Sequence, residues 1–318
     1  MPILISDTPP DVPLSEVVDV LPTAWGQPSM TWTGWTGETF NLAGDFKAAT
    51  LMEAEGRSGL VMPPIEHYSV RAATSDGETW QGYNVLPRDV TWPIIIVGDS
   101  PQAMREEHRR FLATMRPDQT GTLDVYAPDG EKRSLTLRYM AGAEGDFGTT
   151  TYGGYWLRHS IKMRAYDPFF YGDPITQPFA YAPGVNFYGG GTGTTAPLFY
   201  ISSSRTVDSA QITNPGDADV YGVWRIYGPF TSATVGFGSS TIVLPFTISA
   251  PHWVEVNTDR RVATIVDDLG ANRWADAGTV KFAPLPAGAT TTLAVTIAGA
   301  GTGTAVEFSF RPKFWRAW

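Results

Sequence analysis

The four histidines of the chain have the widest chemical range of its side chains, because imidazole binds metal ions and transfers protons near neutral pH. They are His67, His108, His159 and His252. None lies in an HExxH motif or at a paired spacing that would place two ligands on one side of a helix. An isolated histidine among strands is more often a packed structural residue than a ligand. The sequence therefore predicts no metal site.

Hydrolytic chemistry would need an activated serine or two facing carboxylates. The serines of Ser202–Ser204 and Gly238–Ser240 lack the GxSxG spacing and the strand-to-helix context that expose a nucleophile. Four acidic residues could in principle form the carboxylate pair of a glycosidase: Glu255, Asp259, Asp267 and Asp268. Carboxylates in the loops of β-proteins are mostly solvated, so the sequence predicts no catalytic residue and no enzyme. The last two leave open a weak Ca²⁺ site, although their spacing matches no defined calcium loop.

A glycine-rich run, Gly191–Ala196, superficially matches a dinucleotide-binding fingerprint. Such a fingerprint needs a strand before it and a helix after it. Pro197 is followed instead by Leu-Phe-Tyr-Ile, which is typical of a strand. The run is therefore interpreted as a flexible linker, and no cofactor is expected.

Tryptophan could stack on sugar rings, and the chain has 11 of them. Trp224 and Trp253 lie in strand-like segments and are expected to fill a core. Trp274 lies in a Gly/Asp-rich loop and is the candidate for a weak contact with carbohydrate. The aromatic end of the chain, residues 314–318, is expected to dock on its own β-sandwich, or alternatively on a neighbouring copy.

Composition limits the classes of function. Of 318 residues, 42% are hydrophobic and 17% are charged, against about a quarter charged in typical soluble domains. A surface so short of charge favours a protein whose surface is largely covered by partners. The net charge of −9 argues against specific nucleic-acid binding, which needs clustered Lys and Arg. Cysteine is absent, so disulfides are excluded. Neither a membrane-length apolar run nor a signal peptide is apparent, which predicts a soluble protein made in the cytoplasm, without membrane insertion.

One convincing helix stands among segments that otherwise predict strands. Ser100 supplies an N-cap hydroxyl and Pro101 occupies the first helical position. Apolar residues then recur along one face as far as Met115, and the dipeptide Arg116-Pro117 is expected to end the helix. Asp-Gly pairs at Asp76 and Asp129 predict hairpins.

The order of elements predicts a mainly β chain of two domains. A first domain over residues 1–176 begins with a Pro-rich arm at 1–28 and contains a β-barrel or sheet with the one helix. A Gly/Pro-rich linker is expected at 177–205. Residues 206–318 contain only strand-like segments separated by turns, which predicts an antiparallel β-sandwich.

Several segments of both domains resemble one known family. They follow the order found there and are Gly56–Pro64, the strand–helix–Arg116-Pro117 unit, Gly121–Tyr126, Trp156–Tyr171 with its terminal DPFFY, Ile212–Asp217 and Val220–Gly228. The first domain resembles the N-terminal ring domain of siphophage distal tail proteins. The second resembles the galectin-like β-sandwich at the C-terminus of that family.

This resemblance implies a structural protein of the virion tail tip, synthesised in the host cytoplasm. It implies a homo-hexameric ring that connects the tail tube protein to the tail hub and the host-recognition apparatus, with receptor-binding proteins as further partners. The N-terminal arm or the loop over residues 140–154 is expected to reach a neighbouring copy or line the lumen. The alternative is a carbohydrate-binding β-sandwich module of a surface-acting protein, which would not need to self-associate.

Overall fold

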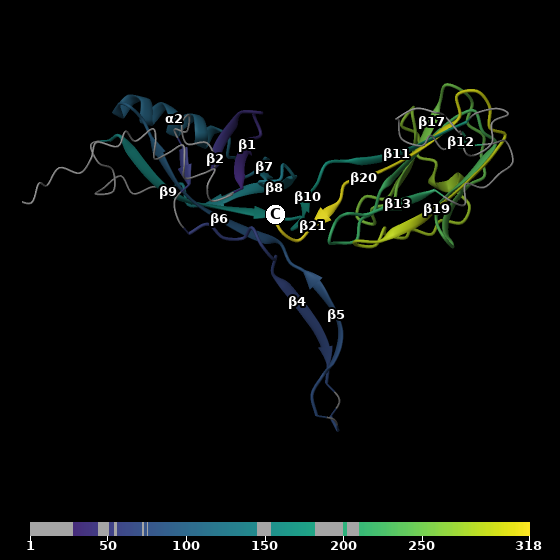
Figure 1. Ribbon diagram of the computed structural model, residues 1–318, viewed down its shortest axis with the longest axis horizontal. Helices are drawn as coiled ribbons and strands as arrows, with labels where there is room; N and C mark the ends of the chain where they lie inside the picture. The colour runs from purple at the N-terminus through teal and green to yellow at the C-terminus, as the bar shows by residue number, and fades with distance from the viewer. Residues whose placement is uncertain are drawn as a thin grey trace, which may run out of the picture. The chain divides into compact units, whose positions relative to one another are not determined.

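The computed structural model describes residues 28–43, 51–53, 56–71, 73–74, 76–144, 154–181, 200–201 and 210–318. Strands dominate these residues, and their one α-helix is α2 (Pro101–Ala113) (Figure 1). The expected mainly β fold is confirmed. None of the described helices has the length and apolarity that a membrane crossing requires.

The chain divides into two compact units. The first unit comprises Met1–Phe170 together with Trp315–Trp318, and the second comprises Tyr171–Phe314. Within the expected linker at 177–205, residues 177–181 belong to strand β11 (Ile175–Tyr181). Residues 182–199 and 202–205 of that linker lie outside the described residues, as do residues 1–27 of the expected arm.

Seven strands form the main path of a nine-stranded sheet. They are β1 (Ser29–Thr33), β2 (Thr39–Ala43), β3 (Leu51–Glu53), β6 (Arg88–Val97), β7 (Gly121–Tyr126), β8 (Lys132–Ala141) and β9 (Trp156–Ala165). Their order is β2-β1-β7-β8-β9-β6-β3, with every pair antiparallel. The end strands β2 and β3 contact each other, so the sheet curls toward a barrel. Two short strands, β10 (Phe170–Tyr171) and β21 (Lys313–Phe314), lie where the chain passes between the units.

Strand β9 illustrates why this sheet has two different faces. Successive side chains in a strand point to opposite sides, so a period of two sorts apolar from polar residues. The inward residues, all buried, are Leu157, His159, Ile161, Met163 and Ala165. The outward positions alternate with them and carry Arg158, Ser160, Lys162 and Arg164. The sequence of β9 thus gives one apolar face and one basic face.

The start of α2 follows the sequence expectation. Ser100 is the N-cap, and its Oγ accepts a hydrogen bond of 3.0 Å from the main-chain N–H of Ala103. The buried side chains of the helix are Met104 and Phe111, which share its apolar face. The predicted amphipathic helix is therefore confirmed at its start and in its buried face.

The end of α2 differs from the expectation. The helix ends at Ala113, before the predicted stop at Arg116-Pro117. Thr114 closes it: its Oγ1 donates to the Phe111 carbonyl at 2.6 Å and accepts a hydrogen bond of 3.0 Å from Trp32 Nε1. A tertiary contact with β1, not the proline, sets the helix length.

Arg88, at the start of β6, is a buried charge at the centre of the first unit, with no exposed surface. Its guanidinium lies 4.9 Å from the Phe170 ring. It donates hydrogen bonds of 2.6 to 2.9 Å to four main-chain carbonyls, those of Gly59, Val61, Pro168 and Trp315. Burial lowers the pKa of Arg88 to about 10. The carbonyl dipoles replace the water that a buried cation loses.

The C-terminus belongs to the first unit. Ala317 is 1% exposed, and its N–H donates to the Leu60 carbonyl at 3.0 Å. Trp315 packs on Phe169 with ring centroids 5.0 Å apart. The expectation that the aromatic end docks on the sandwich is wrong, because Arg88 and the loop at Leu60 bind it in the first unit.

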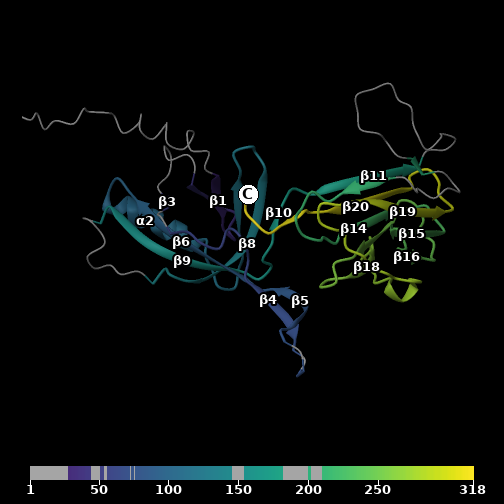
Figure 2. The same ribbon diagram turned by 60° about the horizontal axis from the view of Figure 1, so that its bottom comes forward.

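The second unit is a sandwich of two sheets (Figure 2). One sheet has the order β12-β11-β20-β14-β17-β18 and contains β11, β12 (Tyr200–Ile201), β14 (Val223–Tyr227), β17 (Trp253–Asn257), β18 (Thr264–Asp267) and β20 (Ala305–Phe310). The other has the order β13-β19-β15-β16 and contains β13 (Gln211–Thr213), β15 (Ser232–Phe237), β16 (Ser240–Leu244) and β19 (Thr290–Ala298). All pairs are antiparallel except β11 with β12. The predicted β-sandwich is confirmed, while its galectin-like character stays a prediction.

The core of the sandwich receives side chains from both sheets. Trp224 is 1% exposed and lies 4.5 Å from Phe308 and 5.8 Å from Phe237, measured between ring centroids. The expectation of a core role is confirmed for Trp224. It is wrong for Trp253, which alternates onto the outer face of its strand and packs under the Arg225 guanidinium at 4.7 Å.

Candidate interaction surfaces

A hairpin of the first unit stands apart from its main sheet. Strands β4 (Ile65–Val70) and β5 (Thr79–Val85) pair with each other and with no other strand among the described residues. Asp76-Gly77 supplies the predicted turn, with Gly77 at a φ of 81°. Figures 1 and 2 both show the hairpin extending away from the main sheet. A two-stranded hairpin without support is marginally stable in water.

One face of the hairpin carries a preformed aromatic cluster of His67, Trp80 and Tyr83. Trp80 and Tyr83 are 58% and 50% exposed, and their rings stack with centroids 6.3 Å apart. Trp80 Nε1 donates to His67 Nδ1 at 3.2 Å, which leaves the proton of a neutral His67 on Nε2. Exposed, rigid Trp and Tyr are the side chains that most often dominate protein interfaces.

The opposite face of the hairpin is apolar as well. Tyr68 and Val70 are 48% and 58% exposed. The Tyr68 hydroxyl donates to Glu66 Oε2 at 3.0 Å, and this hydrogen bond raises the pKa of Tyr68. Because both faces expose large apolar side chains to water, the hairpin has the character of an interaction surface.

A basic face lies on the outer side of β8 and β9. It comprises Arg138, Arg158, Lys162 and Arg164. Arg138 of β8 and Arg164 of β9 are directly opposite each other. Two like charges in such a position destabilise the pairing of the strands. Asp89 offsets part of this repulsion through a bidentate contact with Arg164 at 2.6 and 2.8 Å, which lowers the pKa of Asp89. An anionic partner would relieve the remainder.

A hollow of about 600 Å³ adjoins the basic face, with Arg138 and Arg164 in its wall. Its apolar lining includes Pro117, Leu137 and Tyr166, whose ring is 61% exposed. The hollow therefore combines cations with apolar surface, and this combination suits an aromatic side chain.

Two histidines that are far apart in the sequence meet in the first unit. His108 of α2 and His159 of β9 have their Nε2 atoms 3.0 Å apart, and their ring planes are nearly parallel, at 9°. Burial lowers the pKa of both, with Arg109 adding to the effect on His108 and His108 to that on His159. His159 Nδ1 is buried without a hydrogen-bond partner.

This pair joins helix and sheet as a neutral N–H···N contact. Among the described residues, no three His, Asp or Glu side chains gather as a metal site. The sequence missed the pair because the two residues lie 51 positions apart. The available signals were the apolar helix face at His108 and the inward strand position of His159.

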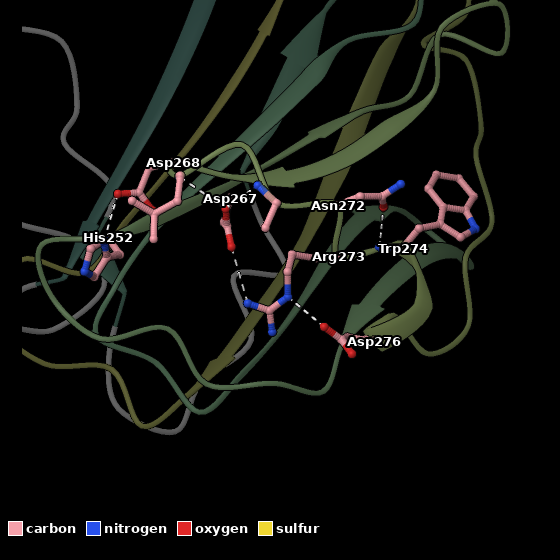
Figure 3. Close-up of polar contacts among 9 residues, drawn as sticks. His252, Asp267, Asp268, Asn272, Arg273, Trp274 and Asp276 are labelled. Atoms are coloured by element: carbon pink, nitrogen blue, oxygen red, sulfur yellow. Dashed lines mark hydrogen bonds and ion pairs between the residues drawn. The ribbon is translucent and has the colours of Figure 1, made fainter.

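In the second unit, the two aspartates considered for calcium, Asp267 and Asp268, each contact a basic side chain (Figure 3). Asp268 Oδ2 lies 2.7 Å from His252 Nδ1, and this contact lowers the pKa of Asp268. Asp267 lies 3.5 Å from Arg273, and its Oδ1 also accepts two main-chain N–H groups of its own turn. Both carboxylates therefore have structural roles in this loop.

The other two candidate carboxylates contact arginines. Glu255 lies 2.6 Å from Arg225, and Asp259 lies 3.1 Å from Arg261. All four candidate carboxylates therefore contact basic side chains.

Trp274 begins the short 3-10 helix η2 (Trp274–Asp276) and is 42% exposed. Its ring lies edge-on to Phe282 with centroids 6.0 Å apart, and its main-chain N–H donates to Asn272 Oδ1 at 2.9 Å. Figure 3 shows the indole pointing away from Arg273, which binds Asp276 at 2.7 Å. The indole is accessible, whereas Arg273 and Asp276 of the same segment form an ion pair with each other.

Comparison with known proteins finds solved structures with a similar fold but no match by sequence. No protein-family model matches the chain, and no curated protein matches it. The crystal structure of the Dit protein of phage SPP1 does match, with a TM-score of 0.60 over 91% of this chain and 99% of that chain, at 15% identity. The chain has the fold of a phage distal tail protein. The resemblance inferred from the sequence is thus confirmed at the level of the fold.

The baseplate of phage p2 is also similar to the chain. Two structures in the activated conformation, with Sr and with Ca, have TM-scores of 0.49 and 0.46 and identities of 10% and 11%. Each match covers 90% of this chain and 98% of the other. The SPP1 protein is described as a paradigm of the hub adsorption apparatus in phages that infect Gram-positive bacteria.

Proposed function

We propose that the protein is a structural component of the tail tip of a long-tailed bacteriophage. It forms a homo-hexameric ring that connects the tail tube to the hub and host-recognition apparatus. The observation that carries this proposal is the match to the SPP1 distal tail protein over nearly the whole of both chains. The function consists of assembly, and no residue is given a catalytic role.

The surfaces of the first unit support a role in assembly. A closed ring needs two different complementary patches on each copy, joined head to tail. The first unit has an exposed apolar hairpin and a separate basic face, whereas a freely soluble monomer would gain nothing from either. The low charged fraction of 17% agrees with a surface that partners cover.

The two units have separate tasks in this proposal. The first unit builds the ring and contacts the tail tube protein and the tail hub. The second unit carries attachment to receptor-binding proteins. A net charge of −9 suits a ring through which DNA must pass without binding.

Light scattering coupled to size exclusion tests the ring directly. A mass near six times 34.6 kDa, or a multiple of it, is expected, with rings visible by electron microscopy. If the protein neither forms rings alone nor binds purified tail tubes in co-sedimentation, the proposal fails.

The exposed indole of Trp274 favours carbohydrate binding as a second candidate function. In this case the second unit binds glycans by stacking, and the chain need not self-associate. A glycan screen would show binding that Trp274→Ala abolishes and Trp253→Ala, a matched change on another outer position, leaves intact. Equal loss in both variants, or no glycan binding, would reject it.

A further inference from the structure

The two histidines that meet inside the first unit both come from regular elements. His108 lies on α2 at helical spacing from the buried side chains Met104 and Phe111. His159 takes an inward position of β9, where it is 3% exposed and pairs in register with Ile94 of β6. A helix and a sheet therefore hold the two imidazoles in place, as a binding site of fixed geometry requires.

The distance between the two Nε2 atoms suits a shared metal ion. Zinc binds a histidine nitrogen at about 2.0–2.1 Å. Two such nitrogens on one ion are therefore about 2.9 Å apart at a right angle and about 3.3 Å apart at the tetrahedral angle. The observed distance between Nε2 of His108 and Nε2 of His159 is 3.0 Å, which lies between these values. An ion bound by both atoms thus requires no separation of helix and strand.

Without an ion, the pair is a costly way to fill this part of the core. A neutral pair places one N–H between the two Nε2 atoms, and His159 Nδ1 is buried without a hydrogen-bond partner. A buried polar atom without a partner costs free energy, and a nearby ion is one explanation for such an atom. The neighbouring inward positions of β9 carry Leu157 and Ile161, so this face accepts apolar residues. The histidine among them therefore indicates binding in addition to packing.

Charged groups near the pair act in both directions. Glu144 interacts with His159 as an opposite charge, which favours a cation. Arg109 follows His108 in the helix and opposes a cation. Both charged residues are exposed, so water screens them and the imidazole nitrogens supply most of the affinity. The described part of the chain provides no third imidazole or carboxylate ligand, so water completes the coordination.

From this geometry we infer that His108 and His159 together bind one divalent transition-metal ion through their Nε2 atoms. Imidazole suits Zn²⁺, Ni²⁺ and Cu²⁺, whereas Mg²⁺ and Ca²⁺ prefer oxygen ligands. On binding, the proton between the rings moves to Nδ1 of the ring that carries it, so both Nε2 lone pairs face the ion. The ion then joins α2 to β9 and stabilises the first unit. This inference goes beyond the proposed ring and does not depend on it.

Zinc titration of the full-length protein tests the site. Chelator-treated protein at pH 7.5 is titrated with Zn²⁺ in a calorimeter, and its thermal unfolding is followed with and without the ion. One ion per chain is expected. A hundredfold excess of Zn²⁺ over its dissociation constant should raise the thermal midpoint of the first unit by about 5–10 °C.

Two ligand variants and a matched control identify the nitrogens. His108→Gln and His159→Gln keep a side chain that forms hydrogen bonds but remove the imidazole, and each should weaken Zn²⁺ binding at least tenfold. The control His252→Gln removes an imidazole that contacts Asp268 in the second unit, and this variant should bind Zn²⁺ like the unmodified protein. Mg²⁺ in place of Zn²⁺ should not shift the thermal midpoint.

Hydrogen exchange of the unmodified protein decides the matter if a ligand variant does not fold. Zn²⁺ should slow exchange at the amides of α2 and β9, because the ion joins these two elements. The amides of the sandwich in the second unit should exchange at the same rate with and without Zn²⁺.

Three results would overturn the inference. In the first, the unmodified protein binds none of Zn²⁺, Ni²⁺ and Cu²⁺ at millimolar concentration. In the second, folded His108→Gln and His159→Gln bind Zn²⁺ as tightly as the unmodified protein does. In the third, Zn²⁺ protects amides elsewhere and leaves α2 and β9 unchanged. The proposed function would survive each of these results, because the ring is measured separately by its mass.

Discussion

Arg88 Nη2 donates a hydrogen bond of 2.6 Å to the carbonyl oxygen of Trp315, a residue 227 positions later in the chain. The contact joins the beginning of β6 to the C-terminal segment inside the first unit. A buried cation is costly unless polar groups surround it, and here main-chain carbonyls from separate segments do so. Arg88 therefore holds the loop at Gly59 and the end of the chain in place together.

Replacing Arg88 should destabilise the first unit strongly. Arg88→Met keeps most of the side-chain volume but leaves buried carbonyls without donors, at a cost of about 1–3 kcal/mol each. We expect a loss of at least about 3 kcal/mol in the free energy of unfolding, measured by denaturant titration. The free energy of unfolding of Arg88→Lys should lie between those of the unmodified protein and Arg88→Met, because one ammonium group cannot reach all four carbonyls. A loss below about 1 kcal/mol for Arg88→Met would contradict this role.

Removing Trp315–Trp318 should affect the first unit and spare the second. The deletion takes away a carbonyl acceptor of Arg88 and the packing of Trp315 on Phe169. Hydrogen exchange should accelerate at the amides of β6 and around Leu60, while the sandwich amides keep their protection. Deprotection of the sandwich instead would show that the tail stabilises the second unit.

Stability should fall in acid because of the His108–His159 pair. The folded protein holds both pKa values below the usual range, so the unfolded chain takes up protons first as the pH falls below about 6.5. The thermal midpoint should therefore decrease from pH 7.5 to pH 5. The double variant His108→Leu with His159→Leu should show a flatter profile over this range. Parallel profiles for the two proteins would count against the pair as a source of the acid sensitivity.

The N-cap of α2 offers a small and local test. Ser100→Ala removes the acceptor for the Ala103 N–H and should cost about 1 kcal/mol. Ser100→Asp keeps an acceptor and should remain close to the original stability. Equal losses in the two variants, measured by denaturant titration, would mean that the serine acts in some other way.

Local signals in the sequence predicted much of this fold. The Ser100-Pro101 pair placed the start of α2, and Asp76-Gly77 placed the turn of the hairpin, because caps and tight turns depend on neighbouring residues only. The alternation of apolar and polar residues along β9 is a local signal of the same kind for the two faces of that strand. These features need no knowledge of the rest of the chain.

Contacts between distant residues were beyond such local reasoning. The helix ends early because Thr114 binds Trp32 of another element. Arg88 resembles an ordinary exposed arginine in the sequence, and its burial follows from four carbonyls that only the fold assembles. The same holds for the histidine pair, whereas the exposure of Trp274 was predicted correctly from its Gly/Asp-rich loop.

The return of the chain to the first unit at Trp315 makes the whole second unit an insertion between Phe170 and Trp315. A domain attached in this way has two covalent connections to its host instead of one. A single proteolytic cut in either connection would leave it tethered by the other, so two cuts are needed to shed it. This redundancy protects the second unit from loss by proteases.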